Sequence, residues 1–341
     1  MADRVTLRDV AEEAGVHTST ASRALNPATR SVVNAETVDR VLSVADRLGY
    51  RPHPLARGLR TNQTFSVGVV IPDVENPLFG PIIAGIDDGI EAGGYSLLIG
   101  NTAHDDPDHT RRVIGSMLER RVDGLILATA SRDDEMLERL IEDGTPVVLV
   151  NRAAELPIPS IVGDDHAGIG LAVAHLAEFG HRRLGHVAGP QELSTGHERR
   201  AAFVEWTDRM GLETGEVEVA EWYQVEPGYS AALRLLDRCP EITAVVGAND
   251  LLALGAYRAA RERGRTVGKE ISITGYNDVP LLDLMQPPLT SVAVPYRRMG
   301  SEAARTMLDL IERPDDEAAR HVSLRLGPTL VVRGSTGPPA G

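Results

Sequence analysis

Three asparagines stand just beyond short apolar runs of the sequence: Asn151, Asn249 and Asn277. Each amide offers both donors and an acceptor, the chemistry that distinguishes hydroxyl patterns on a small ligand. For any one of them alone, the alternative is a loop asparagine that bonds to its own backbone. Their repeated occurrence at the ends of predicted strands favours a shared binding pocket.

The apolar runs themselves predict the architecture around these asparagines. One series comprises residues 67–71, 96–99, 124–128 and 146–150, and a second series begins near Ile161 and comprises residues 184–188, 244–247 and 271–274. Runs that are continuously apolar indicate parallel strands covered by helices on both faces. We therefore expect an α/β fold with two doubly wound halves, in which ligands bind beyond the carboxyl ends of the strands.

The N-terminal segment, residues 5–26, predicts two short helices about a turn at Gly15. Thr6 and Asp9 have the spacing of a capping box at the start of the first helix. In the second helix, apolar residues can face the first, which leaves four polar side chains on the opposite face: Thr18, Ser19, Ser22 and Arg23.

This polar face suits the major groove of DNA, where arginine pairs bidentately with guanine and short hydroxyls reach base edges or phosphates. The alternative is an ordinary helical hairpin with a solvated face. A third helix is predicted from Asn34 to Leu48, followed by residues 50–54, whose prolines no helix crosses. Residues 55–60 are expected to become helical only when a partner chain and DNA order them.

Charge is distributed unevenly between the N-terminal segment and the rest of the chain. The formal net charge is −14, yet residues 1–62 carry nine arginines against seven acids, so that the acidity belongs to the larger, C-terminal part. A basic end on an acidic body orients the protein toward nucleic acid. The single cysteine, Cys239, excludes an internal disulfide, and neither a signal peptide nor a membrane span is expected, which predicts a cytoplasmic, nucleoid-associated protein.

Catalytic motifs are missing from the sequence. It has no G-x-S-x-G elbow, no H-E-x-x-H helix and no Cys/His cluster with zinc spacing. Residues 264–270 superficially suggest a phosphate-binding loop, but the glycine spacing is too short and no Ser or Thr follows Lys269. We predict that the protein is not an enzyme and needs no metal or cofactor.

Several ordered motifs carry a family resemblance. The strongest is T-L-x-D-V-A-x-x-A-G-V-x-x-x-T-x-S-R-x-L-N at Thr6 to Asn26. Others follow in order: L-G-Y-x-P at 48–52, A-x-x-L at 56–59, N-P-L-F at 76–79, G-H-R-R at 180–183, A-N-D at 248–250, G-Y-N-D at 275–278 and P-L-T-S at 288–291. From Val5 to about Val332 the chain resembles the lactose-repressor (LacI/GalR) family of bacterial transcription factors.

The resemblance implies a periplasmic-binding-protein-like core of two lobes joined by three crossovers, with a small ligand in the cleft. It adds Asn76, Phe79, Arg199 and Tyr223 to the ligand-binding candidates Asn151, Asn249 and Asn277. Trp222, beside Tyr223, is the competing aromatic residue. Where sugar-binding relatives often carry aspartate, this chain has asparagine at 151 and 277, which implies a less anionic pocket.

For DNA, the resemblance implies contacts from Thr6, His17, Thr18, Ser19, Ser22, Arg23 and Asn26. His17 stands where the family usually has serine, which leaves the phosphate contacts and the operator sequence open. Leu59 is expected to wedge into the minor groove at the centre of a pseudo-palindromic operator, or else to pack between subunits. No heptad tail follows the core, so we expect a homodimer.

We therefore expect a DNA-binding transcriptional regulator, a repressor, whose operator affinity is controlled by a small ligand, with a carbohydrate as the first choice. The alternatives are a purine- or nucleoside-responsive regulator and a cytosolic solute-binding protein. The expected domains are a helix-turn-helix at 1–50, a linker at 51–63, a core at 64–335 and a flexible tail at 336–341. Within the core, residues 64–163 and 296–323 form the first lobe, and 164–292 and 324–335 the second.

Overall fold

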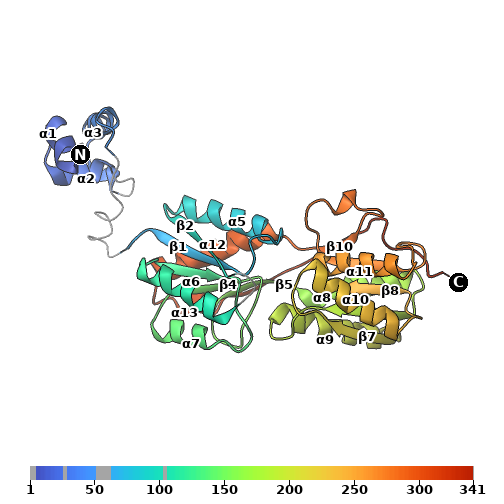
Figure 1. Ribbon diagram of the computed structural model, residues 1–341. Helices are drawn as coiled ribbons and strands as arrows, with labels where there is room; N and C mark the ends of the chain where they lie inside the picture. The colour runs from blue at the N-terminus through green and yellow to red at the C-terminus, as the bar shows by residue number, and fades with distance from the viewer. Residues whose placement is uncertain (1–4, 26–28, 51–62, 103–105, 341) are drawn as a thin grey trace. The chain divides into compact units, whose positions relative to one another are not determined.

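The structure is a computed structural model that describes residues 5–25, 29–50, 63–102 and 106–340, apart from the side chains of residues 214 and 215. The chain divides into two compact units, Met1–Phe65 and Ser66–Gly341, and each is described by itself (Figure 1).

The first unit is a small helical domain. Its elements are α1 (Leu7–Glu13), α2 (Thr18–Leu25), the 3-10 helix η1 (Arg30–Val32) and α3 (Ala35–Arg47). The predicted capping box at the start of α1 is confirmed: the Asp9 backbone N–H donates to the Thr6 hydroxyl, and the Thr6 backbone N–H donates to the Asp9 carboxylate at 2.7 Å. Gly15 has the left-handed φ of +66° that ends the turn after α1.

Small apolar side chains fill the core of this unit. Ala21 and Ala24 of α2 are fully buried against Val10 of α1 and Val41 of α3. The Arg40 guanidinium also donates to the Ala14 carbonyl at 3.0 Å, which satisfies a helix-end oxygen and ties α3 to the end of α1. The predicted inward face of α2 is thus confirmed, and its polar face is left for other contacts.

The second unit begins with a lobe built on an all-parallel sheet of order β11-β5-β4-β3-β1-β2. The strands are β1 (Ser66–Ile71), β2 (Ser96–Asn101), β3 (Gly124–Leu127), β4 (Val147–Val150), β5 (Ser160–Gly163) and β11 (Ser323–Leu326). One face is covered by α5 (Phe79–Ala92) and α12 (Tyr296–Glu312), and the other by α6 (Pro107–Glu119) and α7 (Glu135–Glu142) (Figure 1). The short α13 (Glu317–Arg320) follows α12.

The second lobe repeats this plan with the order β12-β10-β9-β8-β6-β7. Its strands are β6 (Arg183–Ala188), β7 (Glu213–Val219), β8 (Ala244–Gly247), β9 (Ser272–Asn277), β10 (Thr290–Ala293) and β12 (Thr329–Val331). They are parallel except that β12 runs antiparallel to β10. The helices α8 (Asp165–Glu178), α9 (Ser194–Arg209), α10 (Val225–Arg238) and α11 (Asp250–Glu262) cover the sheet, and η2 (Leu282–Leu284) precedes β10.

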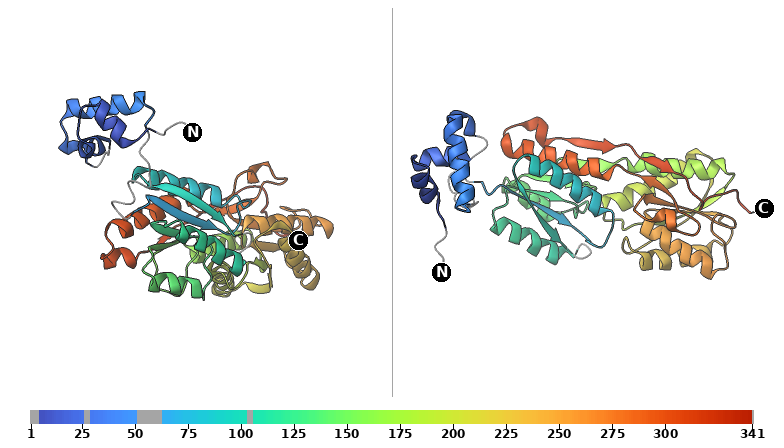
Figure 2. Two further views of the ribbon diagram at one scale, coloured as in Figure 1. Left: turned by 60° about the vertical axis from the view of Figure 1, so that its left-hand side comes forward. Right: turned by 90° about the horizontal axis from the view of Figure 1, so that it is seen from above.

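The chain passes between the two lobes three times, after β5, after β10 and after β11 (Figures 1 and 2). The first lobe extends three residues beyond the approximate boundary expected at residue 323, because Leu324 pairs with Ile161 and Leu326 with Gly163 in the first sheet. The doubly wound α/β architecture with three crossovers is as predicted.

The segment expected to be a flexible tail packs against the second lobe instead. Thr336 lies 2.9 Å from the ring of His175, and the Gly337 carbonyl lies 2.9 Å from Nε2 of His181. The Gly337 backbone N–H donates to Ser272 at 3.1 Å. The prediction was wrong for these residues because polar side chains on α8, β9 and the α8–β6 turn form hydrogen bonds with the Thr336 hydroxyl and the Gly337 backbone.

Two glycines bring α5 and α12 into close contact in the first lobe. A Cβ on Gly85 would lie 2.0 Å from the Arg297 carbonyl oxygen, and one on Gly300 would lie 2.1 Å from that of Ile82. No larger residue fits at this crossing without displacing a backbone. The helix that carries Phe79 is therefore held closely against the helix that follows the second crossover.

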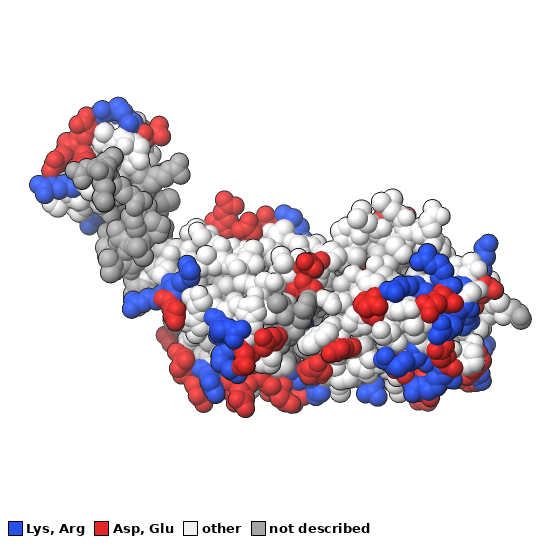
Figure 3. Space-filling view, viewed as in Figure 1, with Lys and Arg blue, Asp and Glu red and all other residues white. Residues whose placement is uncertain are grey.

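Charged side chains cover the core unevenly. On the face in Figure 3, acidic residues line the lower margin of the first lobe, whereas the arginines of the second lobe lie among acids. Several of these arginines pair directly, as in Arg263 with Asp237 at 2.6 Å and Arg234 with Glu218 at 2.8 Å. No described helix is long and apolar enough to cross a membrane.

Candidate functional site

The first candidate site is the polar face of α2. Thr18, Ser19 and Arg23 are exposed, and Ser22 is half-buried. Among the residues that the structure describes, no acidic group pairs with the Arg23 guanidinium, although most arginines of the core do have such a partner. The face therefore presents short hydroxyls beside a guanidinium that is available to an external acceptor.

His17 and Thr6 both cap helices in this unit. Nδ1 of His17 accepts the Ser19 backbone N–H at 3.2 Å and lies 2.8 Å from the Ser19 hydroxyl, so the imidazole takes the capping role of a short polar residue at the start of α2. Thr6 caps α1, and its backbone N–H, followed by its hydroxyl, lowers the pKa of Asp9. Asn26 and Leu59 lie outside the described residues.

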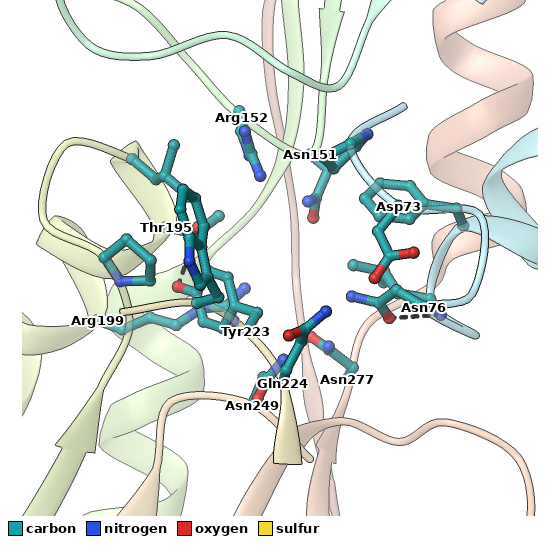
Figure 4. Close-up of a pocket in the computed structure, with 16 residues that line it drawn as sticks. Asp73, Asn76, Asn151, Arg152, Thr195, Arg199, Tyr223, Gln224, Asn249 and Asn277 are labelled. Atoms are coloured by element: carbon teal, nitrogen blue, oxygen red, sulfur yellow. Dashed lines mark hydrogen bonds between the residues drawn. The ribbon is translucent and has the colours of Figure 1, made fainter. Parts of the chain in front are cut away.

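The second candidate site is a pocket between the two lobes (Figure 4). All seven predicted ligand-binding residues line it, from both lobes: Asn76, Phe79, Asn151, Arg199, Tyr223, Asn249 and Asn277. The positions of Asn151, Asn249 and Asn277 at strand ends explain part of the convergence, because the carboxyl ends of parallel strands meet at one edge of a sheet.

The first lobe contributes the loop after β1 and the residue after β4. The Asn76 side chain accepts the Leu78 backbone N–H at 3.1 Å and so shapes the loop that leads to Phe79, the buried first residue of α5. Asn151 has a left-handed φ of +65°, a conformation in which asparagine is less strained than most other residues. The backbone thus aims the Asn151 amide into the pocket (Figure 4).

Asn249 and Asn277 form part of the wall from the second lobe. The Asn249 side chain accepts the Leu252 backbone N–H at 2.8 Å, so it also caps α11. The side-chain amide oxygen Oδ1 of Asn277 accepts a hydrogen bond of 2.7 Å from the hydroxyl of Tyr296, the first residue of α12 after the second crossover. A pocket residue of the second lobe is therefore bonded directly to a helix of the first lobe.

Arg199 forms the floor of the pocket and is 4% exposed. Its Nε donates to the Asp165 carboxylate at 2.8 Å, one Nη donates to the Ala248 carbonyl at 2.7 Å, and the guanidinium lies 3.9 Å from the centre of the Tyr276 ring. Burial acts to lower the pKa of Arg199. The Asp165 carboxylate acts in the opposite direction, and the net result is a raised pKa, so the guanidinium stays charged. Burial raises the pKa of Asp165, and the Arg199 charge opposes that rise.

Asp250 lies behind this wall, in the first turn of α11. It accepts a hydrogen bond from the Ser291 hydroxyl at 2.5 Å and one from the Val279 backbone N–H at 2.9 Å, which ties α11 to β10 and to the loop after β9. Burial raises the pKa of Asp250 to about 7. A carboxyl group near its midpoint of titration thus supports the segment that carries Asn277.

Trp222 and Tyr223 both line the pocket, so lining alone does not distinguish the two aromatic residues. The hydroxyl of Tyr223 also donates to the Thr195 hydroxyl at 3.2 Å, and this contact is what favours Tyr223.

Arg152, beside Asn151, also lies at a strand end as the sequence predicts, and it lines the pocket. Sequence reasoning missed three further polar residues of the pocket: Asp73, Thr195 and Gln224. Asp73 follows β1, so the rule that selected Asn151 applied to it as well. Thr195 and Gln224 lie at a helix start and a loop, where no sequence signal marks them.

The cavity that these side chains leave is small, about 50 Å³. For comparison, a buried cavity that binds one benzene molecule measures about 150 Å³. A ligand of the size of a sugar or nucleoside therefore requires the two lobes, or the side chains between them, to move apart.

Comparisons with known proteins match both parts of the chain. The model of the "Bacterial regulatory proteins, lacI family" matches residues 6–53, and that of the "Periplasmic binding protein-like domain" matches residues 173–336. The HTH-type transcriptional regulator MalR of Streptomyces coelicolor is 36% identical over 97% of this chain and 96% of its own length. The HTH-type transcriptional repressor CytR of Escherichia coli strain K12 is 33% identical over the same shares.

Comparison with solved structures also identifies transcriptional regulators. The lac repressor dimer bound to operator and the anti-inducer ONPF matches with a TM-score of 0.84 at 28% identity, covering 98% of this chain and all of that one. A complex of the transcriptional regulator CelR with cellobiose matches with a TM-score of 0.74 at 30% identity, covering 97% and 100%. These relatives are regulators and not enzymes, as the sequence predicted. The chain belongs to the lacI family and is a DNA-binding transcriptional regulator with a ligand-binding core.

Proposed function

We propose that this protein is a homodimeric repressor that binds a pseudo-palindromic operator and responds to a carbohydrate bound between the lobes of its core. The observation that carries the ligand response is the convergence of seven predicted side chains on one interlobe pocket. The polar face of α2, with an arginine free of acidic partners among the described residues, supports the DNA contact.

The chemistry of the pocket favours a neutral ligand rich in hydroxyl groups. Asparagine amides from both lobes offer donors and acceptors, while Phe79, Trp222 and Tyr223 offer ring faces. The charge of Arg199 is already matched by Asp165, so it adds no net positive charge for an anionic ligand. A relative was solved with cellobiose, which agrees with this class. The same aromatic faces would also stack on a purine, and a nucleoside is the second candidate.

Control of DNA binding would follow from movement between the lobes. The small volume of the cavity favours a change in the separation of the lobes when a ligand binds. Three crossovers, and the bond from Tyr296 to Asn277, link that separation to α12, which packs on α5 through Gly85 and Gly300. Coupling of this kind is reciprocal: DNA must change ligand affinity by the factor by which the ligand changes DNA affinity.

Exposed apolar side chains support the homodimer. Val74 is 63% exposed and Ile99 53% in the first lobe, and Leu281 is 69% and Leu284 71% exposed in the second. Ile99 lies on β2, which runs along the upper side of the core in Figure 1, and Leu281 and Leu284 lie at η2. Burial of such side chains against a second copy is a common reason for their exposure in an isolated chain.

In the dimer, two copies of α2 would enter successive major grooves, with Arg23 reading a base edge and Leu59 wedged into the central minor groove. A protein with this task acts in the cytoplasm on the bacterial nucleoid. Arg23→Ala should lose the preference for operator over random DNA while non-specific binding largely survives. An equal loss of affinity for operator and for random DNA would show that Arg23 contacts only phosphate.

The ligand proposal is tested by titrating the protein with sugars, sugar phosphates and nucleosides in a thermal-shift assay, and repeating hits in an operator-binding assay. Asn151→Gly is the sharpest variant, because glycine keeps the left-handed backbone and removes only the amide. We expect about a tenfold loss of affinity for the hit, the effect of one buried hydrogen-bonding group.

The matched control is Arg121→Gly, which also replaces a residue of positive φ (+55°) but lies outside the pocket. It should bind the hit like the parent protein. If Asn151→Gly binds the hit as tightly as the control, the interlobe pocket is not the ligand site. If no sugar binds but a nucleoside does, the second candidate replaces the first.

A further inference from the structure

A second cavity, of about 280 Å³, lies in the first lobe at the end of the sheet opposite the interlobe pocket. Its wall includes Val147, the first residue of β4, whereas Asn151 of the interlobe pocket follows the last residue of that strand. The two cavities therefore lie at opposite ends of one short strand and share no lining residue.

The walls of this second cavity are apolar. Aliphatic side chains come from α7, β4, the segment before β5 and α12, and prolines fill the spaces between them: Ile141, Val147, Ile158, Leu310, Pro146, Pro157, Pro159 and Pro314. Ile141 is 40% exposed, although Leu137 and Leu140 of the same helix are buried. The cavity thus keeps apolar surface open to solvent.

The rim of the cavity is basic. Arg320 and His321 are exposed there. The Arg320 guanidinium donates to the Pro314 carbonyl, and within the described residues no carboxylate pairs with it. The neighbouring acid Asp316 is engaged elsewhere, since it caps α13 and lies 3.5 Å from Arg313. One cationic group without an acidic partner therefore stands at the mouth of an apolar cavity.

We propose that this cavity is a second ligand site, which takes a small amphipathic carboxylate with an aromatic or branched aliphatic body. The volume supports the body, because a cavity of about 150 Å³ already holds a benzene ring when its walls are aliphatic. The Arg320 guanidinium supplies the partner for the carboxylate. This site is independent of the proposed carbohydrate site.

Backbone hydrogen bonds connect the wall of this cavity to the first residue of β1. The Leu125 backbone N–H donates to the carbonyl of Pro146 in the cavity wall at 2.9 Å, and the Asp123 N–H donates to the Ser66 carbonyl at 2.8 Å. Ser66 is the first residue of β1 and of the second unit, where the chain arrives from the helical domain. A ligand that displaces Pro146 thus acts on the strand that receives the linker.

The test uses the full chain and ligand-observed NMR with 3-phenylpropionate as the probe and 3-phenylpropanamide as its neutral counterpart. The acid should bind with a Kd on the order of 1 mM, given its size, and about two- to fivefold more tightly than the amide. Arg320→Gln should abolish this preference. Ile141→Trp should fill the mouth of the cavity and weaken both probes by about tenfold or more.

Two controls make the result specific. Leu171→Trp enlarges a side chain on α8 that is 38% exposed, close to the exposure of Ile141, and should leave binding unchanged. Asn151→Gly should also leave it unchanged, which separates this site from the interlobe pocket. The proposal is overturned if the acid does not bind, if Ile141→Trp and Leu171→Trp behave alike, or if Ile141→Trp changes only the oligomeric state in sedimentation.

Discussion

Replacing Arg199 should lower the unfolding free energy of the core by much more than replacing a pocket residue that only contacts a ligand. Arg199 and Asp165 form an ion pair at 2.8 Å whose side chains are only 5% and 7% exposed. Arg199→Met keeps much of the apolar stem but leaves the carboxylate buried without its partner, which costs about 3–5 kcal/mol of unfolding free energy. Asp165→Asn should cost a similar amount, because the buried guanidinium then loses its counter-charge, although it keeps the Ala248 carbonyl and the Tyr276 ring.

The double variant decides whether the pair acts as a unit. Arg199→Met with Asp165→Asn should cost about 2–3 kcal/mol less than the sum of the single changes. Urea unfolding followed by tryptophan fluorescence measures this in the core alone, because both tryptophans of the chain, Trp206 and Trp222, lie there. Arg200→Met, at the exposed neighbouring position, is the control and should cost under about 0.5 kcal/mol. Additive single changes, or a cost for Arg199→Met below about 1 kcal/mol, would refute this reasoning.

Three further changes test other parts of the structure. Burial raises the pKa of Asp250 to about 7, so the folded state binds more protons than the unfolded chain and stability falls as pH rises toward that value. Asp250→Asn should remove this contribution, so that the unfolding free energy falls by about 2 kcal/mol less between pH 5 and 7, and an unchanged pH profile would contradict the assignment. Gly300→Ala should cost about 1–3 kcal/mol in urea unfolding because its Cβ meets backbone. Gly115→Ala, with open space in α6, should instead be neutral or stabilising, and equal effects would count against the tight crossing. Tyr296→Phe removes the donor to Asn277 and should cost about 1–2 kcal/mol and weaken the change in operator affinity on ligand binding; a variant with full response would exclude this bond from the coupling.

Local signals made the helical domain predictable from sequence. The Thr6 and Asp9 capping box, Gly15 and the alanines of α2 act within a few residues of each other, and the structure confirms each of them. The pocket was predictable for a different reason. Continuous apolar runs identify parallel strands, and topology then brings residues such as Asn151 and Asn277 together although they are far apart in the chain.

Features that depend on distant partners escaped prediction. The edge strand β7, which reads ETGEVEV, alternates polar and apolar residues and carries no continuous apolar run. Asp165 is 34 residues before Arg199, so nothing in the sequence indicates that it neutralises that arginine. The packing of Thr336 and Gly337 likewise depends on side chains of the second lobe.

The two sheets also differ from the helical domain in when they can form during synthesis. The first sheet is completed only when β11, residues 323–326, pairs with β5, and the second only when β12 pairs with β10. The contacts of the helical domain all lie within the first 65 residues. A nascent chain can therefore fold its helical domain early, while both lobes wait until almost the whole chain has left the ribosome. Premature termination near residue 320 would release a folded helical domain attached to a core in which neither sheet is complete.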